Sequence, residues 1–399
     1  MPWKECHVMD ERLRFVARLL EGEKMAPLCA EFGISRKTGY KIFDRYKDNG
    51  VTAFTDRSRR PYRQANRLPA PIEATIVRLK REYPGWGAPK IREKLRQRVT
   101  GVTGVQLPAI STVHAVLDRY HLVKRRRRRR GDAPAATVLT RPTDPNALWC
   151  ADYKGEFMLG NRRYCYPLTI TDFASRYLLT CEALSTTQER FAFTVFDRAF
   201  KEFGLPQAIR TDNGVPFAGP TALYRLSKLA VWWLRLGIRI ERIAPGHPQQ
   251  NGRHERMHRT LKAEATKPAA PNVLQQQARF DIFVARYNHD RPHQALGMKV
   301  PAALYTRSAR VYRGLEDLSY PFADATFTVT HCGRICFHGR KINLSHVFAG
   351  QNVGVTQVGE RIWLVTFMQY DLGYFDDEVG RLEPITNPFG PKVLPMCSE

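Results

Sequence analysis

The chain has 399 residues, of which 43% are hydrophobic and 25% are charged. This is enough apolar material for roughly two to four packed domains, and it excludes a largely disordered protein. No apolar stretch approaches the roughly 20 residues of a membrane helix, and no apolar run follows the first five residues as in a signal peptide, so we expect a cytoplasmic protein. The formal net charge is +25, and residues 1–145 carry 32 basic and 15 acidic side chains, or +17 of that total. A basic first third indicates a polyanionic partner, most commonly nucleic acid, although a merely soluble basic surface would have the same charge.

Residues 1–60 have the pattern of a helix-turn-helix DNA-binding domain. Asp10 is placed to cap a first helix, residues 27–32 form a short second helix, and Ser35 is placed to cap a third helix that ends near Lys47. Recognition helices present their N-terminal residues to the major groove. The side chains that the third helix presents there are Arg36, Lys37, Thr38, Tyr40 and Lys41. A purely structural three-helix bundle is the alternative, and it gives no reason for so basic a surface.

Residues 70–123 have the pattern of a second helical module. One helix starts near Ile72 and ends at Tyr83, a second covers 90–98, and Ser111 is placed to cap a third. We interpret this segment as an all-α, winged-helix-like DNA-binding domain. Two tandem modules would allow the protein to read a long DNA end.

A basic linker, residues 124–145, follows the two modules. It opens with a run of seven positive charges and continues with three prolines. Like charges at this density repel one another and keep a chain extended. We therefore expect the run to lie along DNA phosphates, where contacts position a protein without specifying sequence. The residues expected there include Lys124, Arg125, Arg126, Arg127 and Arg128.

Residues 146–308 change to a mixed pattern of strands and helices. We expect strands over 148–159, 162–171 and 176–184, a helix over 187–203, a strand over 207–211, a helix carrying Leu223, Leu226, Leu229 and Ala230, a strand over 238–243 and a long helix from about Gln249. Three antiparallel strands followed by alternating helix and strand is the order of the α/β RNase H-like fold. Residues 309–399 show short strands over 325–330, 334–337, 340–344, 352–357 and 361–368, which predicts a small all-β barrel.

Three acids in the mixed region are placed to hold metal ions. Cleavage and joining of phosphodiesters need a water or 3′-hydroxyl in line with a leaving oxygen, and two divalent metals about 4 Å apart serve both oxygens. Asp152 interrupts an apolar and aromatic strand, Asp212 stands where a buried strand ends, and Glu255 lies 43 residues later on the long helix. Each acid alone would suit a salt bridge or a turn. Together, in strand, strand end and helix, they predict a catalytic and metal-binding triad.

Other acids compete less well for these roles. Asp172 ends the second strand and is the serious rival to Asp152, but a turn-capping role before Ser175 fits it better. Glu264 lies about 180° around the helix from Glu255, and Glu241 alternates outward on its strand. No Ser/His/Asp or Cys/His nucleophile arrangement and no Walker-type glycine loop is evident, so we expect no use of ATP.

The eight cysteines are scattered and form no CxxC pair, which suits reduced thiols better than disulfides. One cluster, His331, Cys332, Cys336 and His338, offers ligand types for zinc. Its spacing matches no usual finger, and it lies in an alternating strand pattern. We expect buried thiols and exposed histidines on a hairpin there.

Four stretches of the mixed region resemble the integrase-core (DDE) transposases of bacterial insertion sequences, relatives of retroviral integrases. They are Trp149-Cys-Ala-Asp152, Thr171-Asp-Phe-Ala-Ser-Arg176, Thr211-Asp-Asn-Gly214 and Pro245-Gly-His-Pro-Gln-Gln-Asn-Gly-Arg-His-Glu-Arg-Met-His-Arg-Thr-Leu-Lys262. Tyr287-Asn288 and Arg291-Pro-His293 also look like the family's post-core helix and loop. The resemblance spans about residues 148–300, and the helix-turn-helix start agrees with it.

The resemblance implies a transposase that binds double-stranded transposon ends and target DNA, cuts and joins strands, and acts as a dimer or tetramer at the bacterial nucleoid. Asp152, Asp212 and Glu255 correspond to the family's triad for two Mg²⁺ or Mn²⁺ ions. The residues that the resemblance or the helix face places near DNA are Gln250, Asn251, His258, Arg259 and Lys262.

Two departures from the family pattern stand out. The spacing from Asp212 to Glu255 is longer than is common, so an extra segment around Trp232-Trp233 must be accommodated. No N-terminal His/Cys zinc module of the retroviral kind is present, and the helix-turn-helix takes its place.

Two other functions remain as alternatives. One is a DNA-binding regulator derived from a transposase whose core no longer cuts, against which the intact triad argues. The other is an RNase H-like nuclease acting on RNA–DNA hybrids, which the duplex-binding character of the first third disfavours.

Overall fold

The computed structural model describes residues 8–56, 68–100, 106–123, 139–244 and 247–389, and the chain divides into two compact units, Met1–Leu68 and Pro69–Glu399. No helix in these described ranges is long and apolar enough to cross a membrane. The arginine-rich run that was expected to contact phosphates, including Lys124 and Arg125 to Arg128, lies outside them.

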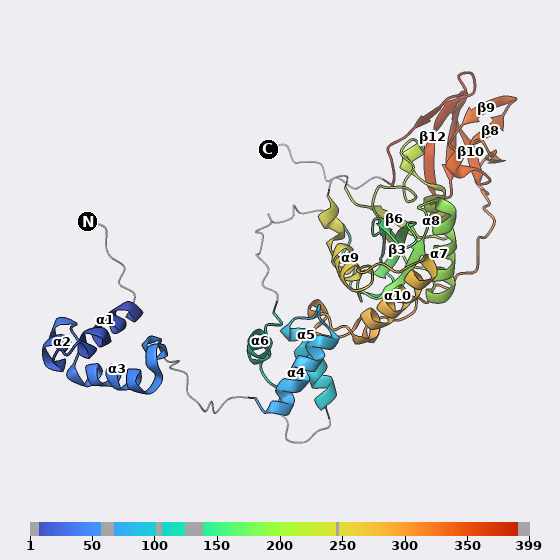
Figure 1. Ribbon diagram of the computed structural model, residues 1–399. Helices are drawn as coiled ribbons and strands as arrows, with labels where there is room; N and C mark the ends of the chain where they lie inside the picture. The colour runs from blue at the N-terminus through green and yellow to red at the C-terminus, as the bar shows by residue number, and fades with distance from the viewer. Residues whose placement is uncertain (1–7, 57–67, 101–105, 124–138, 245–246, 390–399) are drawn as a thin grey trace, which may run out of the picture. The chain divides into compact units, whose positions relative to one another are not determined.

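The first unit is a small helical domain (Figure 1). Its elements are α1 (Val8–Leu20), α2 (Met25–Glu31), α3 (Arg36–Asn49) and the 3-10 helix η1 (Gly50–Phe54). Phe15, Leu28 and Phe54 are buried in its core. The side chain of Ser35 accepts a hydrogen bond from the Thr38 N–H, which confirms the predicted cap of α3. Asp10 does not cap α1 as expected, because the helix already includes Val8 and places Asp10 in its first turn.

The second unit begins with three helices, α4 (Ala70–Glu82), α5 (Ala88–Val99) and α6 (Ile110–Arg119). Ile76, Ile91 and Val113, one from each helix, are fully buried. α4 ends at Glu82, and the predicted Tyr83 is its C-cap. Ser111 is not the cap of α6, since the helix begins at Ile110 and its N-cap is Ala109. The described ranges 68–100 and 106–123 contain no strand, so the wing of a winged helix stays a prediction.

The next part of the chain contains a mixed sheet. Its strands are β1 (Trp149–Tyr153), β2 (Phe157–Met158), β3 (Tyr164–Asp172), β4 (Leu178–Leu184), β5 (Ala208–Thr211) and β6 (Arg239–Arg242). The order across the sheet is β4-β3-β1-β5-β6, with β2 pairing further along β3. β3 is antiparallel to both β1 and β4, whereas β1, β5 and β6 are parallel. This is the predicted RNase H-like order.

Helices cover both faces of the sheet. They are α7 (Glu189–Phe203), α8 (Lys228–Arg235), α9 (Gly252–Glu264) and α10 (Val273–Ala285). Trp149, Ala151 and Ile170 pack in one cluster with α7 and α8. The opposite face, with Cys165 and Cys181, packs in another cluster with α9 and α10. Figure 1 shows the strands between α9 on one side and α7 and α8 on the other. The alternation of side chains along each strand therefore separates an apolar face from a face that α9 completes.

Three details differ from the expected elements. The helix expected to carry Leu223 to Ala230 is broken: the 3-10 helix η2 (Leu223–Arg225) ends at a bend around Tyr224, whose φ is 53°, and Ser227 then caps α8. The helix expected from Gln249 begins as the 3-10 turn η3 (Pro248–Asn251) before α9. α10 was not predicted. It is followed by three short turns, η4 (Arg286–Asp290), η5 (Gln294–Leu296) and η6 (Pro301–Ala303).

The last part of the chain is all-β. Its elements are β7 (Ala325–Thr328), β8 (Arg334–Phe337), β9 (Arg340–Asn343), η7 (His346–Phe348), β10 (Asn352–Gly359), β11 (Ile362–Phe367), β12 (Tyr370–Asp376) and β13 (Leu382–Pro384). They form an antiparallel sheet in the order β13-β12-β11-β10-β7 and a β8-β9 hairpin, joined by a bridge between Asn343 and Arg381. β12 and β13 were missed from the sequence. Closure into a barrel stays a prediction.

The extra segment between Asp212 and Glu255 packs against this all-β domain. Tyr224, Leu226 and Val231 share one buried cluster with the strands of the all-β domain. The Tyr224 hydroxyl donates a hydrogen bond of 2.6 Å to the Leu372 carbonyl in β12. The long spacing that set the sequence apart therefore has a structural use, because it supplies the surface on which the all-β domain is held.

Candidate active site

Asp152 and Asp212 lie beside each other on neighbouring strands. β1 and β5 are parallel, with Trp149 opposite Ile209 and Cys150 opposite Arg210. Asp152 and Asp212 follow this last pair by two residues each, Asp212 just past the end of β5, and the charge of Asp212 acts on Asp152. Trp149 and Ile209 belong to the cluster on the α7 side. Both acids follow these residues by three positions, so both project from the face that α9 covers.

The turn after β5 holds Asp212 in place. The Gly214 N–H donates a hydrogen bond of 3.1 Å to Asp212 Oδ1, and the Asn213 side chain donates one of 2.7 Å to the Ile243 carbonyl at the end of β6. These contacts tie the strand end to its neighbour. The Asp-Asn-Gly sequence is thus both an ordinary turn signal and the support of a carboxylate at the sheet edge.

Glu255 comes from the first turn of α9 and is exposed. The positive end of a helix dipole favours an acid at that place. Arg253, two residues earlier, donates a hydrogen bond of 2.9 Å to the Phe173 carbonyl, and its guanidinium stacks over the Phe173 ring. This contact fixes the start of α9 against the sheet, and it leaves Glu255 facing outward near the two aspartates.

The three carboxylates interact electrostatically. Burial, together with the neighbouring charges of Asp212 and Glu255, raises the pKa of Asp152 to about 7. Burial also raises the pKa of Asp212, although the Gly214 amide lowers it. Like charges and poor solvation both disfavour the ionised form of a carboxylate. The site therefore concentrates more negative charge than its own residues neutralise.

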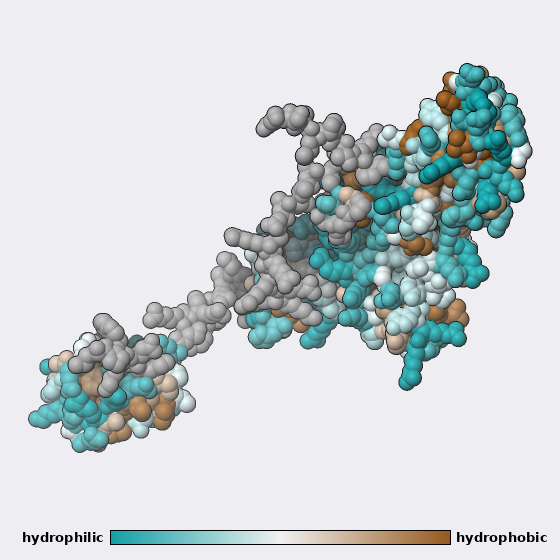
Figure 2. Space-filling view, turned by 90° about the horizontal axis from the view of Figure 1, so that it is seen from above, coloured by the Kyte–Doolittle hydropathy of each residue, from teal (hydrophilic) through white to brown (hydrophobic). Residues whose placement is uncertain are grey.

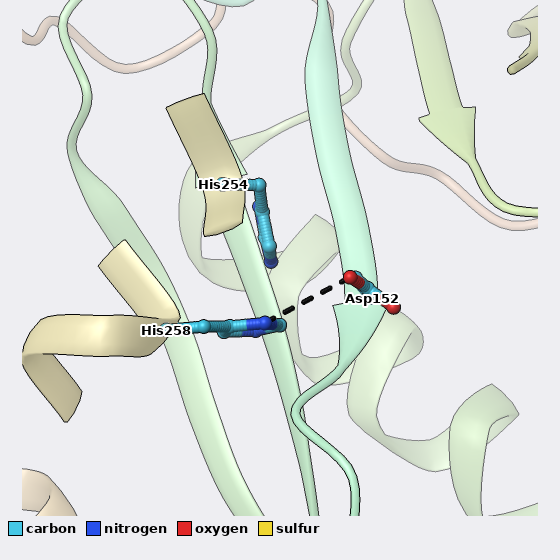
Figure 3. A group of neighbouring side chains, drawn as sticks. All are labelled: Asp152, His254 and His258. Atoms are coloured by element: carbon cyan, nitrogen blue, oxygen red, sulfur yellow. Dashed lines mark ion pairs between the residues drawn. The ribbon is translucent and has the colours of Figure 1, made fainter. Parts of the chain in front are cut away.

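Two histidines of α9 lie against the same strands (Figure 3). Nε2 of His254 and Nε2 of His258 are each 2.7 Å from the Thr169 hydroxyl on β3, and Nδ1 of His254 is 2.9 Å from the Thr171 hydroxyl. Nδ1 of His258 lies 3.8 Å from Asp152 Oδ2. Burial lowers the pKa of His254 to about 3 and that of His258 to about 2, so both rings are neutral at pH 7.

Lysines border the site as well. Burial lowers the pKa of Lys154, two residues after Asp152, and the charge of Lys262 lowers it further, so the two ammonium groups lie near each other. Lys154 also acts on Asp152, whose charge it favours. Lys262 is exposed. Two cations beside three acids suit a site that binds both metal ions and phosphates.

The rival acids have structural roles. Asp172 accepts hydrogen bonds from the Asn146 N–H, from the Ser175 N–H and from the Ser175 hydroxyl, which confirms its turn-capping role. It lies opposite Trp149, whereas Asp152 lies opposite Thr169. Glu264 pairs with Arg291, and Glu241 pairs with Arg210. These acids are therefore held by partners away from the triad.

The expected DNA-contacting residues differ in their exposure. Arg36, Lys37, Thr38, Tyr40 and Lys41 are all exposed on α3, and so are Arg259 and Lys262 on α9. Gln250 is partly buried, and its side chain accepts a hydrogen bond from the Ala244 N–H. His258 and Asn251 are only 7% and 5% exposed, and their expected contact with DNA stays a prediction. His258 faces Thr169 and Asp152, because α9 lies with that side on the sheet.

The sequence reasoning missed His254, Thr169, Thr171 and Lys154. A signal for His254 was present, since His254-Glu255-Arg256-Met257-His258 has the H-E-x-x-H spacing that places two imidazoles on one helix face. No comparable signal marks the threonines, which matter only because β3 pairs with β1. The thiols of Cys332 and Cys336, expected to be buried, are exposed. Among the described residues, the group placed to share a metal ion is Asp152, His254 and His258, and the hairpin cysteines belong to no such group.

The donor set fits a divalent cation. Mg²⁺ and Mn²⁺ accept carboxylate oxygens as ligands, and a neutral histidine can contribute an imidazole nitrogen to the same ligand set. A cation between Asp152, Asp212 and Glu255 would offset the repulsion that raises the pKa of Asp152. The arrangement is chemically suited to holding metal ions beside a phosphate at an open sheet edge.

Comparison with known protein families agrees with this geometry. Models of the integrase core domain match residues 142–248 and 236–301. A helix-turn-helix domain model matches residues 11–62, and a homeodomain-like domain model matches residues 38–117.

Relatives come from insertion elements and retroviruses. An uncharacterized 31.7 kDa protein of insertion element IS407 from Burkholderia multivorans is 28% identical over 45% of this chain and 62% of its own length. One of insertion element IS476 from Xanthomonas euvesicatoria is 25% identical over 60% of this chain and 65% of its own. The chain thus spans less than two thirds of either relative. The Pol polyprotein of Feline endogenous virus ECE1 is 30% identical over 32% of this chain and 12% of its own.

Among solved structures, the chain is similar to the HTLV-2 integrase catalytic core domain in complex with magnesium. The two are 16% identical with a TM-score of 0.33, over 42% of this chain and 100% of that one. A simian T-cell lymphotropic virus intasome chain gives 14% identity and a TM-score of 0.37 over 74% of this chain and 97% of that one. The family models show that the chain carries an integrase core domain and helix-turn-helix domains, and it is related to bacterial insertion-element proteins.

Proposed function

We propose that this protein is a transposase that binds the ends of an insertion element and catalyses metal-dependent DNA cleavage and strand transfer. The observation that supports it most is the convergence of Asp152, Asp212 and Glu255 at one edge of an RNase H-like sheet, where their charges raise the pKa of Asp152. A pair of divalent cations, when bound, would place a nucleophile and a leaving oxygen in line and neutralise developing charge.

Each residue of the triad has its own part in this proposal. Asp152, whose pKa both other acids raise, would hold the cations together with Asp212 from a turn and Glu255 from the first turn of α9. Lys154 and Lys262 would bind the phosphates of the DNA end and keep it at the sheet edge.

DNA binding is proposed for the regions outside the core. The exposed basic residues at the start of α3 would contact the major groove, and residues 70–123 would add a second module. The face drawn in Figure 2 is mainly hydrophilic where it is coloured, with apolar residues in scattered small groups. A surface of this kind suits a charged partner such as DNA better than a broad apolar interface. Because two element ends must be joined together, we propose that the protein acts as an oligomer.

The test is cleavage and strand transfer on a labelled element end with Mg²⁺ or Mn²⁺. Asp212→Asn and Glu255→Gln should abolish both reactions and leave end binding unchanged. Asp197→Asn is a matched control, because Asp197 is an acid on α7 that pairs with Lys201 on the opposite face of the sheet. Strand transfer that survives the loss of Asp212 or Glu255 would remove the triad from the mechanism.

The same assay separates the alternatives. A DNA-binding regulator would retain end binding and show no metal-dependent nicking in the wild-type chain. A nuclease for RNA–DNA hybrids would cleave a hybrid faster than a duplex end.

A further inference from the structure

The Thr169 hydroxyl determines where the protons of two histidines lie. Its oxygen is 3.0 Å from the Asp152 carbonyl oxygen and 2.7 Å from Nε2 of both His254 and His258. A hydroxyl has one proton to donate and two lone pairs to accept with. A carbonyl oxygen only accepts, so the Thr169 proton goes to Asp152. Both Nε2 atoms must therefore carry hydrogen and donate to Thr169.

The other nitrogens of the two rings have different surroundings. A neutral imidazole with hydrogen on Nε2 has a lone pair on Nδ1. In His254 that lone pair accepts from the Thr171 hydroxyl, 2.9 Å away. In His258 the lone pair faces Asp152 Oδ2 at 3.8 Å. His254 therefore has both nitrogens engaged, whereas His258 presents an unused lone pair to a carboxylate.

The distance between these two atoms fits joint coordination. Nδ1 of His258 and Oδ2 of Asp152 are 3.8 Å apart, which is too long for a hydrogen bond. Ligands that each lie about 2.1 Å from one metal ion are at most about 4.2 Å apart. A cation between Nδ1 of His258 and Oδ2 of Asp152 is therefore within reach of both without a change of rotamer.

We propose that His258 is a nitrogen ligand of a divalent cation held by Asp152, and that Thr169 is the positioning residue that fixes its tautomer and orientation. This rests on the proposed function only in assuming a cation at Asp152. Metal-bound histidines regularly donate their second ring N–H to an oxygen acceptor, and the bond from Nε2 to Thr169 has that form. The site then combines three acids with one imidazole.

The same contacts argue against a zinc site that uses both histidines of the H-E-x-x-H segment. Such a site needs a free lone pair on each ring. His254 could supply one only by giving up its hydrogen bond to Thr171 or to Thr169. The hydrogen bonds therefore allow one nitrogen ligand at this site and not two. Imidazole favours transition metals, so the cation site should prefer Mn²⁺ over Mg²⁺ more than an all-carboxylate site does.

The decisive measurement is pulsed electron paramagnetic resonance of Mn²⁺ added alone to the full-length chain. A directly bound imidazole couples the metal electron spin to its ¹⁴N nucleus. We expect this ¹⁴N modulation in the wild-type chain and its replacement by a ¹⁵N signal when only histidine is ¹⁵N-labelled. Bound Mn²⁺ without histidine nitrogen coupling would overturn the proposal. This experiment requires no substitution, so it does not depend on a variant that folds.

Variants assign the nitrogen to one ring. His258→Asn keeps a polar atom near Nδ1, and it should abolish the ¹⁴N modulation and weaken Mn²⁺ binding by about 10-fold or more, with a smaller loss for Mg²⁺. His254→Asn is the matched control and should retain the modulation. Loss of coupling in His254→Asn with retention in His258→Asn would reverse the assignment and overturn the proposal.

Asp152→Asn separates this proposal from the proposed function. If Mn²⁺ binding does not depend on Asp152 at all, the metal site of the proposed function fails, and the histidine ligand fails with it. If binding depends on Asp152 and shows no histidine coupling, the proposed function stands and only the histidine ligand is wrong.

Discussion

The two neighbouring strand ends of the active site hold their acids in different ways. At the end of β5, Asp212 receives a hydrogen bond from the Gly214 N–H, and Asn213 ties the same turn to β6. Asp152 is the fourth of the five residues of β1, and Nδ1 of His258, 3.8 Å from its Oδ2, donates nothing to it. Both carboxylates accept a backbone hydrogen bond, Asp152 from Tyr153, but burial and the charges of two neighbouring acids raise the pKa of Asp152, whereas burial alone raises that of Asp212.

This difference shows where the site depends on its cation. A carboxylate beside other acids is costlier to ionise, and a bound cation offsets that cost. Asp152 should therefore link metal binding to the stability of the fold more strongly than Asp212 does.

The largest expected effect is on the reaction, where the two acids should be equal. Asp152→Asn and Asp212→Asn should each reduce strand transfer by at least about 10³-fold, because each removes charge that holds a metal worth several kcal/mol in the transition state. End binding, measured by gel shift in the absence of metal, should not change. A residual rate within about 10-fold of wild type for either variant would show that this acid is not a metal ligand.

The two acids should differ in how they affect the stability of the fold. An ordinary aspartate ionises near 3.8, and Asp152 in the folded chain ionises at about 7. The unfolded chain therefore loses this proton first as the pH rises, so the folded state is destabilised progressively between about pH 4 and pH 7. Without metal, Asp152→Asn should be more stable to urea than wild type at pH 7, by about a few kcal/mol, and this advantage should vanish near pH 4.

The matched variant Asp212→Asn should show a smaller gain, since its side chain oxygen still accepts from Gly214. Saturating Mn²⁺ at pH 7 should make wild type more stable to urea than Asp152→Asn, because wild type gains a metal-bound state that Asp152→Asn lacks. Equal pH dependence in Asp152→Asn and wild type would mean that Asp152 titrates normally.

The contrast also explains what the sequence could and could not predict. Asp212 was identified from local signals, a buried strand followed by Asn213-Gly214, and the structure places it in such a turn. The recognition helix was equally local, with Ser35 as its cap. Asp152 as an acid facing the site followed from strand order. The surroundings of Asp152 did not follow from the sequence, because Thr169 lies beside Asp152 only through the pairing of β3 with β1.

Non-local packing accounts for the other differences. His258 was assigned to the exposed face of its helix with Glu255 and Arg259, but helical spacing cannot say which side lies on the sheet. The break at Tyr224 is imposed by the all-β domain, where the Leu372 carbonyl accepts a hydrogen bond from the Tyr224 hydroxyl. The roles of the DNA-contacting residues remain predictions, because they depend on a partner that only the exposed side chains of α3 and α9 suggest.

A smaller effect should come from the turn that supports Asp212. A Cβ at Gly214 would lie 3.0 Å from Asp212 Oδ2 and 3.4 Å from Oδ1. Gly214→Ala should therefore displace the carboxylate and lower strand transfer by about 10-fold, with the metal-free unfolding curve little changed. Gly252→Ala is the control at the start of α9, where a Cβ meets nothing within 4 Å. Equal rates for the two variants would show that the position of Asp212 tolerates the shift.

The smallest effect concerns the lysines beside Asp152. Lys262 is exposed and lies near Lys154, at the edge where a DNA end would approach. A phosphate contact releases counterions, so Lys262→Gln should reduce the slope of log affinity against log salt by about one, uniformly across DNA sequences. Lys201→Gln, on α7 and paired with Asp197, should leave the slope unchanged. If Lys262→Gln alters neither slope nor affinity, DNA does not cross the α9 side of the sheet edge, and Asp152 must meet its substrate from the β5 side.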